Sequence, residues 1–149
     1  MRTLAFVLMM LGSMQVFAGQ VDKEIHCLAK NIYHEARGEP DAGQLAVALV
    51  TMNRVYSGKY PNTVCDVVWQ AYQFSWTMDE EIYKVVDDEQ SWLKAQTLAT
   101  MVYKKYATLR DDTKGALYYY APKKVYPHWA RFKQVTRTIG SHVFLKERS

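Results

Sequence analysis

The segment 40–56 constrains the fold most, because its middle is the unbroken apolar run Leu45-Ala46-Val47-Ala48-Leu49-Val50. Pro40 is well suited to the first turn of a helix, and Gly58 follows the segment. A helix that is apolar on every side has no face for solvent, so other elements must surround it. At 149 residues the chain has the length of one average domain. The sequence therefore predicts one domain around a central helix at 40–56.

Two further long helices are indicated by apolar residues spaced three and four apart. The first covers residues 22–37, with Asp22 as its expected N-cap and Gly38 ending it. The second covers residues 88–107, with Asp88 as its expected N-cap. Both helices present an apolar stripe, and we expect these stripes to cover the central helix.

The remaining segments are shorter and change character towards the C-terminus. A short helix is expected at 63–70, and the Tyr-rich segment 115–121 is typical of a strand. Segments 135–139 and 142–145 flank Gly140-Ser141, which predicts a two-residue hairpin turn with Gly first. The sequence thus predicts an α+β fold, mainly helical, with a small antiparallel β element near the C-terminus.

Residues 1–18 have the pattern of a secretory signal peptide. Arg2 precedes an apolar run at 4–11, and Val16-Phe17-Ala18 places small residues around a cleavage site. The apolar run is too short to span a bilayer, so a retained anchor is the less favoured alternative. We expect cleavage after Ala18 to release a mature domain at 19–149, secreted or periplasmic, with no stable membrane insertion.

The net charge is small. The formal charge is +4, and loss of the leader removes one basic residue and leaves +3. Mild basicity favours approach to an anionic envelope, whereas a nucleic-acid binder is expected to show a denser basic stripe than Lys123-Lys124. We expect a monomer that needs neither metal nor cofactor.

Cys27 and Cys65 form an even pair. In an exported protein such a pair predicts one disulfide rather than reactive thiols. It would close a loop of about 38 residues, for which chain entropy gives roughly 3 to 4 kcal/mol of stabilisation.

The segment 31–40 places two carboxylates, Glu35 and Glu39, around a helix end. Cleaving a glycosidic bond requires a carboxylic acid that is still protonated near the working pH. The helix C-terminus disfavours ionisation of Glu35, and burial against Tyr33 or Trp76 would act in the same direction. Spacing alone leaves open the alternative of a solvated glutamate at a helix end.

The chain resembles the cell-wall hydrolase family that includes the spore cortex-lytic enzymes. The motifs that carry the resemblance lie in order along residues 19–149: Asn31-Ile32-Tyr33-His34-Glu35-Ala36-Arg37-Gly38-Glu39-Pro40, Gly43-Gln44, Ala46-Val47-Ala48, Asn53-Arg54-Val55, Pro61-Asn62-Thr63-Val64-Cys65, Gln73-Phe74-Ser75-Trp76 and Ile139-Gly140-Ser141-His142-Val143-Phe144. The resemblance implies a lysozyme-like fold. It also implies that Glu35, the first Glu of Glu-Ala-Arg-Gly-Glu, is the catalytic acid.

One departure from the family pattern concerns substrate binding. Relatives are expected to have Gly-Ala-Thr-His where this chain has Gly115-Ala116-Leu117-Tyr118. A contact made there by Thr or His is therefore in doubt, although Tyr118 or Tyr119 can still offer a hydroxyl.

The other candidate substrate-binding residues combine amide, hydroxyl, carboxylate and aromatic groups. They are Glu39, Gln73, Phe74, Ser75, Trp76, Tyr118, Tyr119 and His142, with His128 and Trp129 as further cleft candidates. Glu39 is expected to cap the central helix or support the cleft, with a second catalytic carboxylate as the alternative. For the aromatic residues and His142, a place in the core is the competing interpretation.

The expected activity is cleavage of peptidoglycan glycan strands. Without a second carboxylate opposite, Glu35 would act first as acid and then as base on the muramic 6-hydroxyl. The resemblance favours this lytic transglycosylase route, at the MurNAc-GlcNAc β-1,4 bond, over a hydrolytic muramidase. Alternatives are a peptidoglycan amidase using zinc or a thiol and a non-catalytic peptidoglycan-binding module. A zinc peptidase is excluded because position 38 is Gly, not His.

Overall fold

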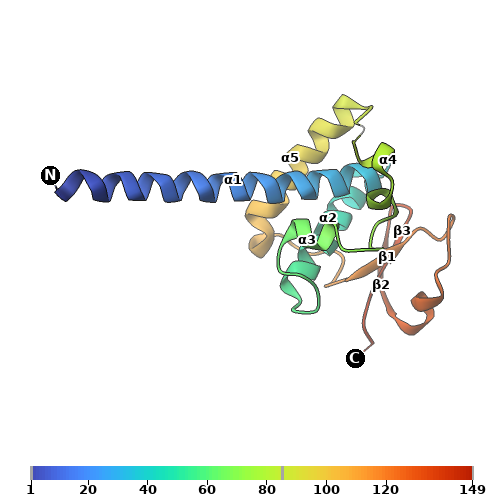
Figure 1. The fold of residues 1–149 in the computed structure, drawn as a ribbon. Coiled ribbons are helices and arrows are strands. Elements are labelled where there is room, and N and C mark those ends of the chain that lie inside the picture. Colours follow the sequence, from blue (N-terminus) through green and yellow to red (C-terminus); the bar gives the residue numbers. More distant parts are fainter. Residues whose placement is uncertain (1, 85, 149) are drawn as a thin grey trace.

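Helix α1 (Arg2–Ala36) is the longest element, and its first half projects beyond the others (Figure 1). The computed structural model describes residues 2–84 and 86–148, without the side chains of 2–17, 83 and 84. The helix is continuous through Asp22, so the expected cap there is wrong: the preceding turn already supplies the hydrogen-bonding partners that a cap would replace. In the part of the chain that the structure describes, no helix is long and apolar enough to cross a membrane. Cleavage after Ala18 stays a prediction.

Helix α2 (Asp41–Tyr56) is the buried centre that the apolar run predicts. From Gly43 to Arg54, every residue except Leu45 is buried. The helix begins one residue later than expected, because Pro40 takes the extended N-cap position and not a place in the first turn. In Figure 1 the other helices gather around α2 and the second half of α1, and the small sheet lies at the far end from the N-terminus.

The other predicted helices form with the caps that their sequences indicate. Helix α3 (Val64–Val68) begins after Thr63, whose Oγ1 accepts a hydrogen bond from the Asp66 amide at 3.1 Å. Helix α5 (Glu89–Lys105) begins after Asp88, whose carboxylate accepts from the Ser91 amide at 3.0 Å, and it packs along α1. The short elements that were not predicted are α4 (Glu80–Lys84), η1 (Ser75–Met78), η2 (Tyr106–Thr108) and η3 (His128–Phe132).

The C-terminal part forms an antiparallel sheet. Its strands are β1 (Tyr118–Tyr120), β2 (Gln134–Ile139) and β3 (His142–Lys146), in the order β1-β3-β2. Gly140 adopts a φ of +59° in the turn between β2 and β3, which explains glycine at the first turn position. Phe144 of β3 is fully buried against Ala46 and Val50 of α2. The predicted α+β architecture is confirmed, and the sheet is fixed to the central helix.

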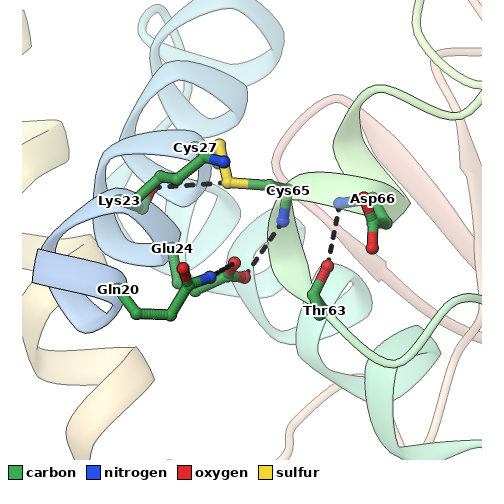
Figure 2. Close-up of a disulfide and its surroundings, with 7 residues drawn as sticks. All are labelled: Gln20, Lys23, Glu24, Cys27, Thr63, Cys65 and Asp66. Atoms are coloured by element: carbon green, nitrogen blue, oxygen red, sulfur yellow. Dashed lines mark hydrogen bonds between the residues drawn. A yellow bond between two sulfur atoms is a disulfide. The ribbon is translucent and has the colours of Figure 1, made fainter. Parts of the chain in front are cut away.

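The disulfide between Cys27 and Cys65 joins α1 to α3 (Figure 2). The two Cα atoms are 5.2 Å apart, within the range that a bridge requires. Beside it, the buried carboxylate of Glu24 accepts hydrogen bonds from the Cys65 amide at 3.1 Å and from Gln20 at 3.0 Å. Covalent and polar contacts together hold α3 against α1.

Candidate active site

A cleft of about 380 Å³ opens between the end of α1, the loop before η1 and strand β1. Its walls combine one carboxylate, two cations, an amide and several aromatic rings: Glu35, Arg54, Tyr60, Tyr72, Gln73, Phe74, Tyr118, Tyr119, Trp129 and Lys133. Aromatic faces next to polar groups suit a sugar chain, because a ring covers the apolar face of a pyranose while hydroxyls find polar partners.

Glu35 lies in the last turn of α1, half-buried in the cleft wall. Burial raises the pKa of its carboxyl above the ordinary value. A hydrogen bond from the Tyr119 hydroxyl and the charges of Arg54 and Lys124 offset part of that rise. The Tyr119 oxygen is 2.9 Å from Oε2 of Glu35. The group can therefore hold a proton to a higher pH than a solvated glutamate, as an acid catalyst must.

The residues expected to bury Glu35 lie elsewhere, and that prediction is wrong. The Tyr33 hydroxyl donates to the Asp87 carboxylate at 2.6 Å and so ties α1 to the segment before α5. Trp76 is 4% exposed and stacks on His34 with 4.5 Å between ring centres. The rings of Tyr33 and Trp76 both belong to the hydrophobic core, and neither lines the cleft that Glu35 faces.

Two polar residues near the end of α2 position the strand that faces Glu35. Asn53 donates to the carbonyl of Ala116 at 3.0 Å, and Arg54 Nε donates to the carbonyl of Leu117 at 2.8 Å. These bonds fix the backbone directly before Tyr119. Sequence reasoning assigned no role to either side chain. The signal was the presence of two polar residues shortly after the apolar run of a helix expected to be buried.

Arg54 also enters the cleft itself. Its guanidinium carbon lies 5.1 Å from the ring centre of Tyr60 and 5.5 Å from that of Phe74. The side chain is 6% exposed, and its NH1 is buried without a hydrogen-bond partner among the described residues. A buried cation beside Glu35 stabilises the ionised carboxylate that forms once the proton has been given away.

The structure brings four of the predicted substrate-binding residues to the cleft and leaves four outside it. Gln73, Phe74, Tyr118 and Tyr119 line it, as does Trp129. Ser75 is exposed at the start of η1. Trp76 lies in the core, so the prediction that it lines the cleft is wrong. His128 is exposed beside the ring of Phe132, with 5.6 Å between ring centres.

Glu39 and His142 support the cleft from behind. Glu39 accepts hydrogen bonds from the amide of Ser141 at 2.8 Å and from its hydroxyl, and makes no side-chain cap on α2. A Cβ at Gly140 would clash with Oε2 of Glu39, so that position needs glycine. His142 is buried, with its ring 5.2 Å from that of Tyr119. The loop after α1 is thereby fixed to the β2-β3 turn.

The charge state of Glu39 differs from that of Glu35. Burial acts to raise the pKa of Glu39, but the two hydrogen bonds from Ser141 and the nearby His142 and Lys124 outweigh it, so the net shift is downward. An ionised Glu39 turned towards the hairpin cannot serve as a second acid. Glu35 is the only carboxylate that lines the cleft in the described part of the chain.

Tyr118, at the position where relatives are expected to have His, also lines the cleft. Its hydroxyl is hydrogen-bonded to Glu147, and Lys133 Nζ lies 4.5 Å from its ring centre and 2.8 Å from Glu147. Tyr118 thus forms a polar group with Glu147 and Lys133, whereas its neighbour Leu117 is buried in the core. No group of three or more His, Cys, Asp or Glu within residues 2–84 and 86–148 is placed to hold a metal ion.

Replacing Tyr119 by Phe should lower the cleavage rate about tenfold, because the hydrogen bond that orients Glu35 is lost. That bond favours the ionised carboxylate, so its removal should also move the high-pH limit of activity upward. Loss of turbidity of purified walls, followed across pH, measures both effects. Tyr56→Phe is the control, since Tyr56 is exposed at the end of α2 and does not line the cleft. An unchanged pH limit in Tyr119→Phe would contradict the assigned contact.

Comparison with known proteins identifies the family. The profile described as Cell Wall Hydrolase matches residues 38–145. The chain belongs to the cell wall hydrolase family. The family match begins three residues after Glu35, so the role of Glu35 rests on the geometry of the cleft.

The spore cortex-lytic enzymes of Bacillus cereus and Halalkalibacterium halodurans are 34% and 32% identical to this chain over 128 and 127 residues. Those alignments cover 86% and 85% of this chain, but only 46% and 36% of the relatives.

Solved structures of this family confirm the fold. The catalytic domain of the Bacillus cereus SleB protein superposes with a TM-score of 0.67 at 34% identity, covering 83% of this chain and 89% of that one. The catalytic domain of the germination-specific lytic transglycosylase SleB from Bacillus anthracis gives 0.66 at 35% identity, covering 83% and 93%. This cell wall hydrolase thus shares the SleB catalytic-domain fold, as the sequence resemblance implied.

Proposed function

We propose that the protein is a lytic transglycosylase of the cell envelope that cuts the MurNAc-GlcNAc β-1,4 bond of peptidoglycan. The observation that carries the proposal is a single half-buried carboxylate, Glu35, with a raised pKa in an aromatic-lined cleft. The name of the Bacillus anthracis relative supports the reaction type. Export of the chain and its action as a monomer belong to the same proposal.

The proposed reaction uses Glu35 twice. Protonated Glu35 gives its proton to the glycosidic oxygen as the bond from that oxygen to the muramic C1 breaks. The resulting carboxylate, stabilised by Tyr119 and Arg54, then takes the proton of the muramic 6-hydroxyl as that oxygen bonds to C1. The products are a 1,6-anhydromuramic end and a free GlcNAc hydroxyl, and no water is consumed.

The alternatives have less support from the site. A hydrolytic muramidase would use a second carboxylate to activate water or form a covalent intermediate, and Glu39 is held by Ser141 instead. A peptidoglycan amidase using a thiol would need a free cysteine, whereas Cys27 and Cys65 are joined. A non-catalytic peptidoglycan-binding module would give no reason for a glutamate with a raised pKa facing the cleft.

Mass analysis of the products from purified peptidoglycan tests the proposal. We expect muropeptides with anhydromuramic ends, lighter by one water than hydrolysis products. Reducing muramic ends alone would replace the transglycosylase reaction with hydrolysis. Released stem peptides would support the amidase, and an intact wall would support the binding module.

A further inference from the structure

The net positive charge of the protein comes from the C-terminal segment that carries the sheet. Residues 113–146 contain seven basic residues and no acidic one, whereas residues 1–112 contain fourteen acidic and eleven basic residues. The segment 113–146 forms β1, η3, β2 and β3 with their connections. The overall charge of +4 hides this asymmetry, because the acidic residues lie almost entirely in the helical part.

The turn at Lys123-Lys124 carries two exposed positive charges. The Lys124 amide donates to the Ala121 carbonyl at 2.9 Å, and both lysines are exposed. The charge of Lys124 acts on Glu35, on Glu39 and on His142, so it lies within electrostatic reach of the cleft. None of the described carboxylates forms an ion pair with it.

The lysine that lines the cleft, Lys133, is already neutralised. Lys133 forms an ion pair with Glu147 at 2.8 Å and lies over the ring of Tyr118. Lys133 is therefore part of the cleft lining, whereas Lys123 and Lys124 are available to a ligand from outside the protein.

Exposed aromatic rings connect this turn to the cleft. Tyr126 is 66% exposed and Trp129 is 37% exposed. Tyr120 contacts both edge-on, with 5.5 Å to Tyr126 and 6.1 Å to Trp129 between ring centres. Because Trp129 also lines the cleft, these rings extend the sugar-binding surface outward to the lysines. Continuity with the cleft favours a glycan strand over a membrane surface.

We infer that the Lys123-Lys124 turn, with Tyr126, binds carboxylates of the peptidoglycan strand beyond the cleft, so that the favoured substrate is carboxylate-bearing glycan. This inference rests on the proposed function. The carboxylates can come from the lactyl group of muramic acid or from the stem peptide, and both carry the negative charge that two unpaired lysines attract.

The test compares two lysine pairs of equal charge. Lys123→Gln with Lys124→Gln is the variant, and Lys104→Gln with Lys105→Gln, exposed at the end of α5, is the control. Three substrates are used: intact walls, walls whose carboxylates have been converted to amides, and peptide-free glycan strands with free lactyl groups. Each protein is assayed at its own pH optimum, since the charge of Lys124 also acts on Glu35.

On intact walls we expect the variant at 123 and 124 to raise the half-saturating substrate concentration roughly threefold to tenfold, with kcat little changed and a weaker salt dependence. On amidated walls it should match the wild type. If the variant at 123 and 124 raises the half-saturating concentration only for intact walls, the lysines bind stem-peptide carboxylates. If it does so only for peptide-free strands, they bind the lactyl group.

Equal loss in both lysine pairs, or no effect of the variant at 123 and 124 on either intact walls or peptide-free strands, would overturn the inference and leave glycan cleavage standing. If only binding to vesicles of anionic lipid depends on Lys123 and Lys124, the surface is a membrane contact and the inference is wrong. Failure of the wild type to cut any of the three substrates contradicts the proposed function instead.

Discussion

Replacing Glu35 by Gln should lower wall cleavage by at least about 100-fold while leaving the melting temperature nearly unchanged. Glutamine keeps the size of the side chain and can still accept the hydrogen bond from Tyr119, but it has no proton to transfer. In the wild type, activity should fall as pH rises through the raised pKa of Glu35, because the acid must start protonated. Turbidity loss of purified walls and thermal unfolding are the two measurements.

Glu39→Gln is the matched control for Glu35→Gln. Its carboxylate accepts two hydrogen bonds from Ser141, so the exchange should cost about 1 to 2 kcal/mol of unfolding free energy but only a small part of the cleavage rate. Glu35→Gln should thus affect the cleavage rate without affecting stability, whereas Glu39→Gln should mainly affect stability. Full activity in Glu35→Gln, or a loss of stability as large as that in Glu39→Gln, would remove Glu35 from its assigned role.

Local patterns predicted most of the secondary structure. The unbroken apolar run at 45–50 identified the buried helix, since no other arrangement hides such a surface. Asp88 and Thr63 identified helix starts because their side chains satisfy free backbone amides. The predicted cap at Asp22 is wrong because α1 already runs through this position. The backbone amides that an N-cap would satisfy have partners in the preceding helical turn.

The site was less predictable, because its contacts join segments far apart in the chain. The hydrogen bond from Tyr119 to Glu35 connects residues 84 positions apart, and helical periodicity cannot predict contacts between such distant residues. Periodicity also gave Trp76 no preference between cleft and core, and stacking on His34 places it in the core. The family resemblance found Glu35, but only packing shows that Arg54 approaches it.

Removal of the disulfide by Cys27→Ala with Cys65→Ala should lower the free energy of unfolding by roughly 3 to 4 kcal/mol, since the bridge closes a loop of 38 residues in the unfolded chain. Both cysteines are buried, so alanine fits without new polar exposure. Denaturant unfolding without reductant measures the loss. Wild-type protein treated with reductant should unfold at nearly the same denaturant concentration as the double variant.

Thr63→Ala separates the cross-link from the local stability of α3, because it removes only the cap of that helix, at a cost of about 1 kcal/mol. A double cysteine variant no less stable than Thr63→Ala would show that the bridge does not constrain the chain. Two reactive thiols in unfolded, unreduced protein would show that it does not form.

The bridge matters to the cleft because Cys27 lies two turns before Glu35 on α1, while Cys65 precedes the wall at Gln73 and Phe74. Reductant should therefore shorten the half-life of activity on heating, as the two walls lose their covalent connection.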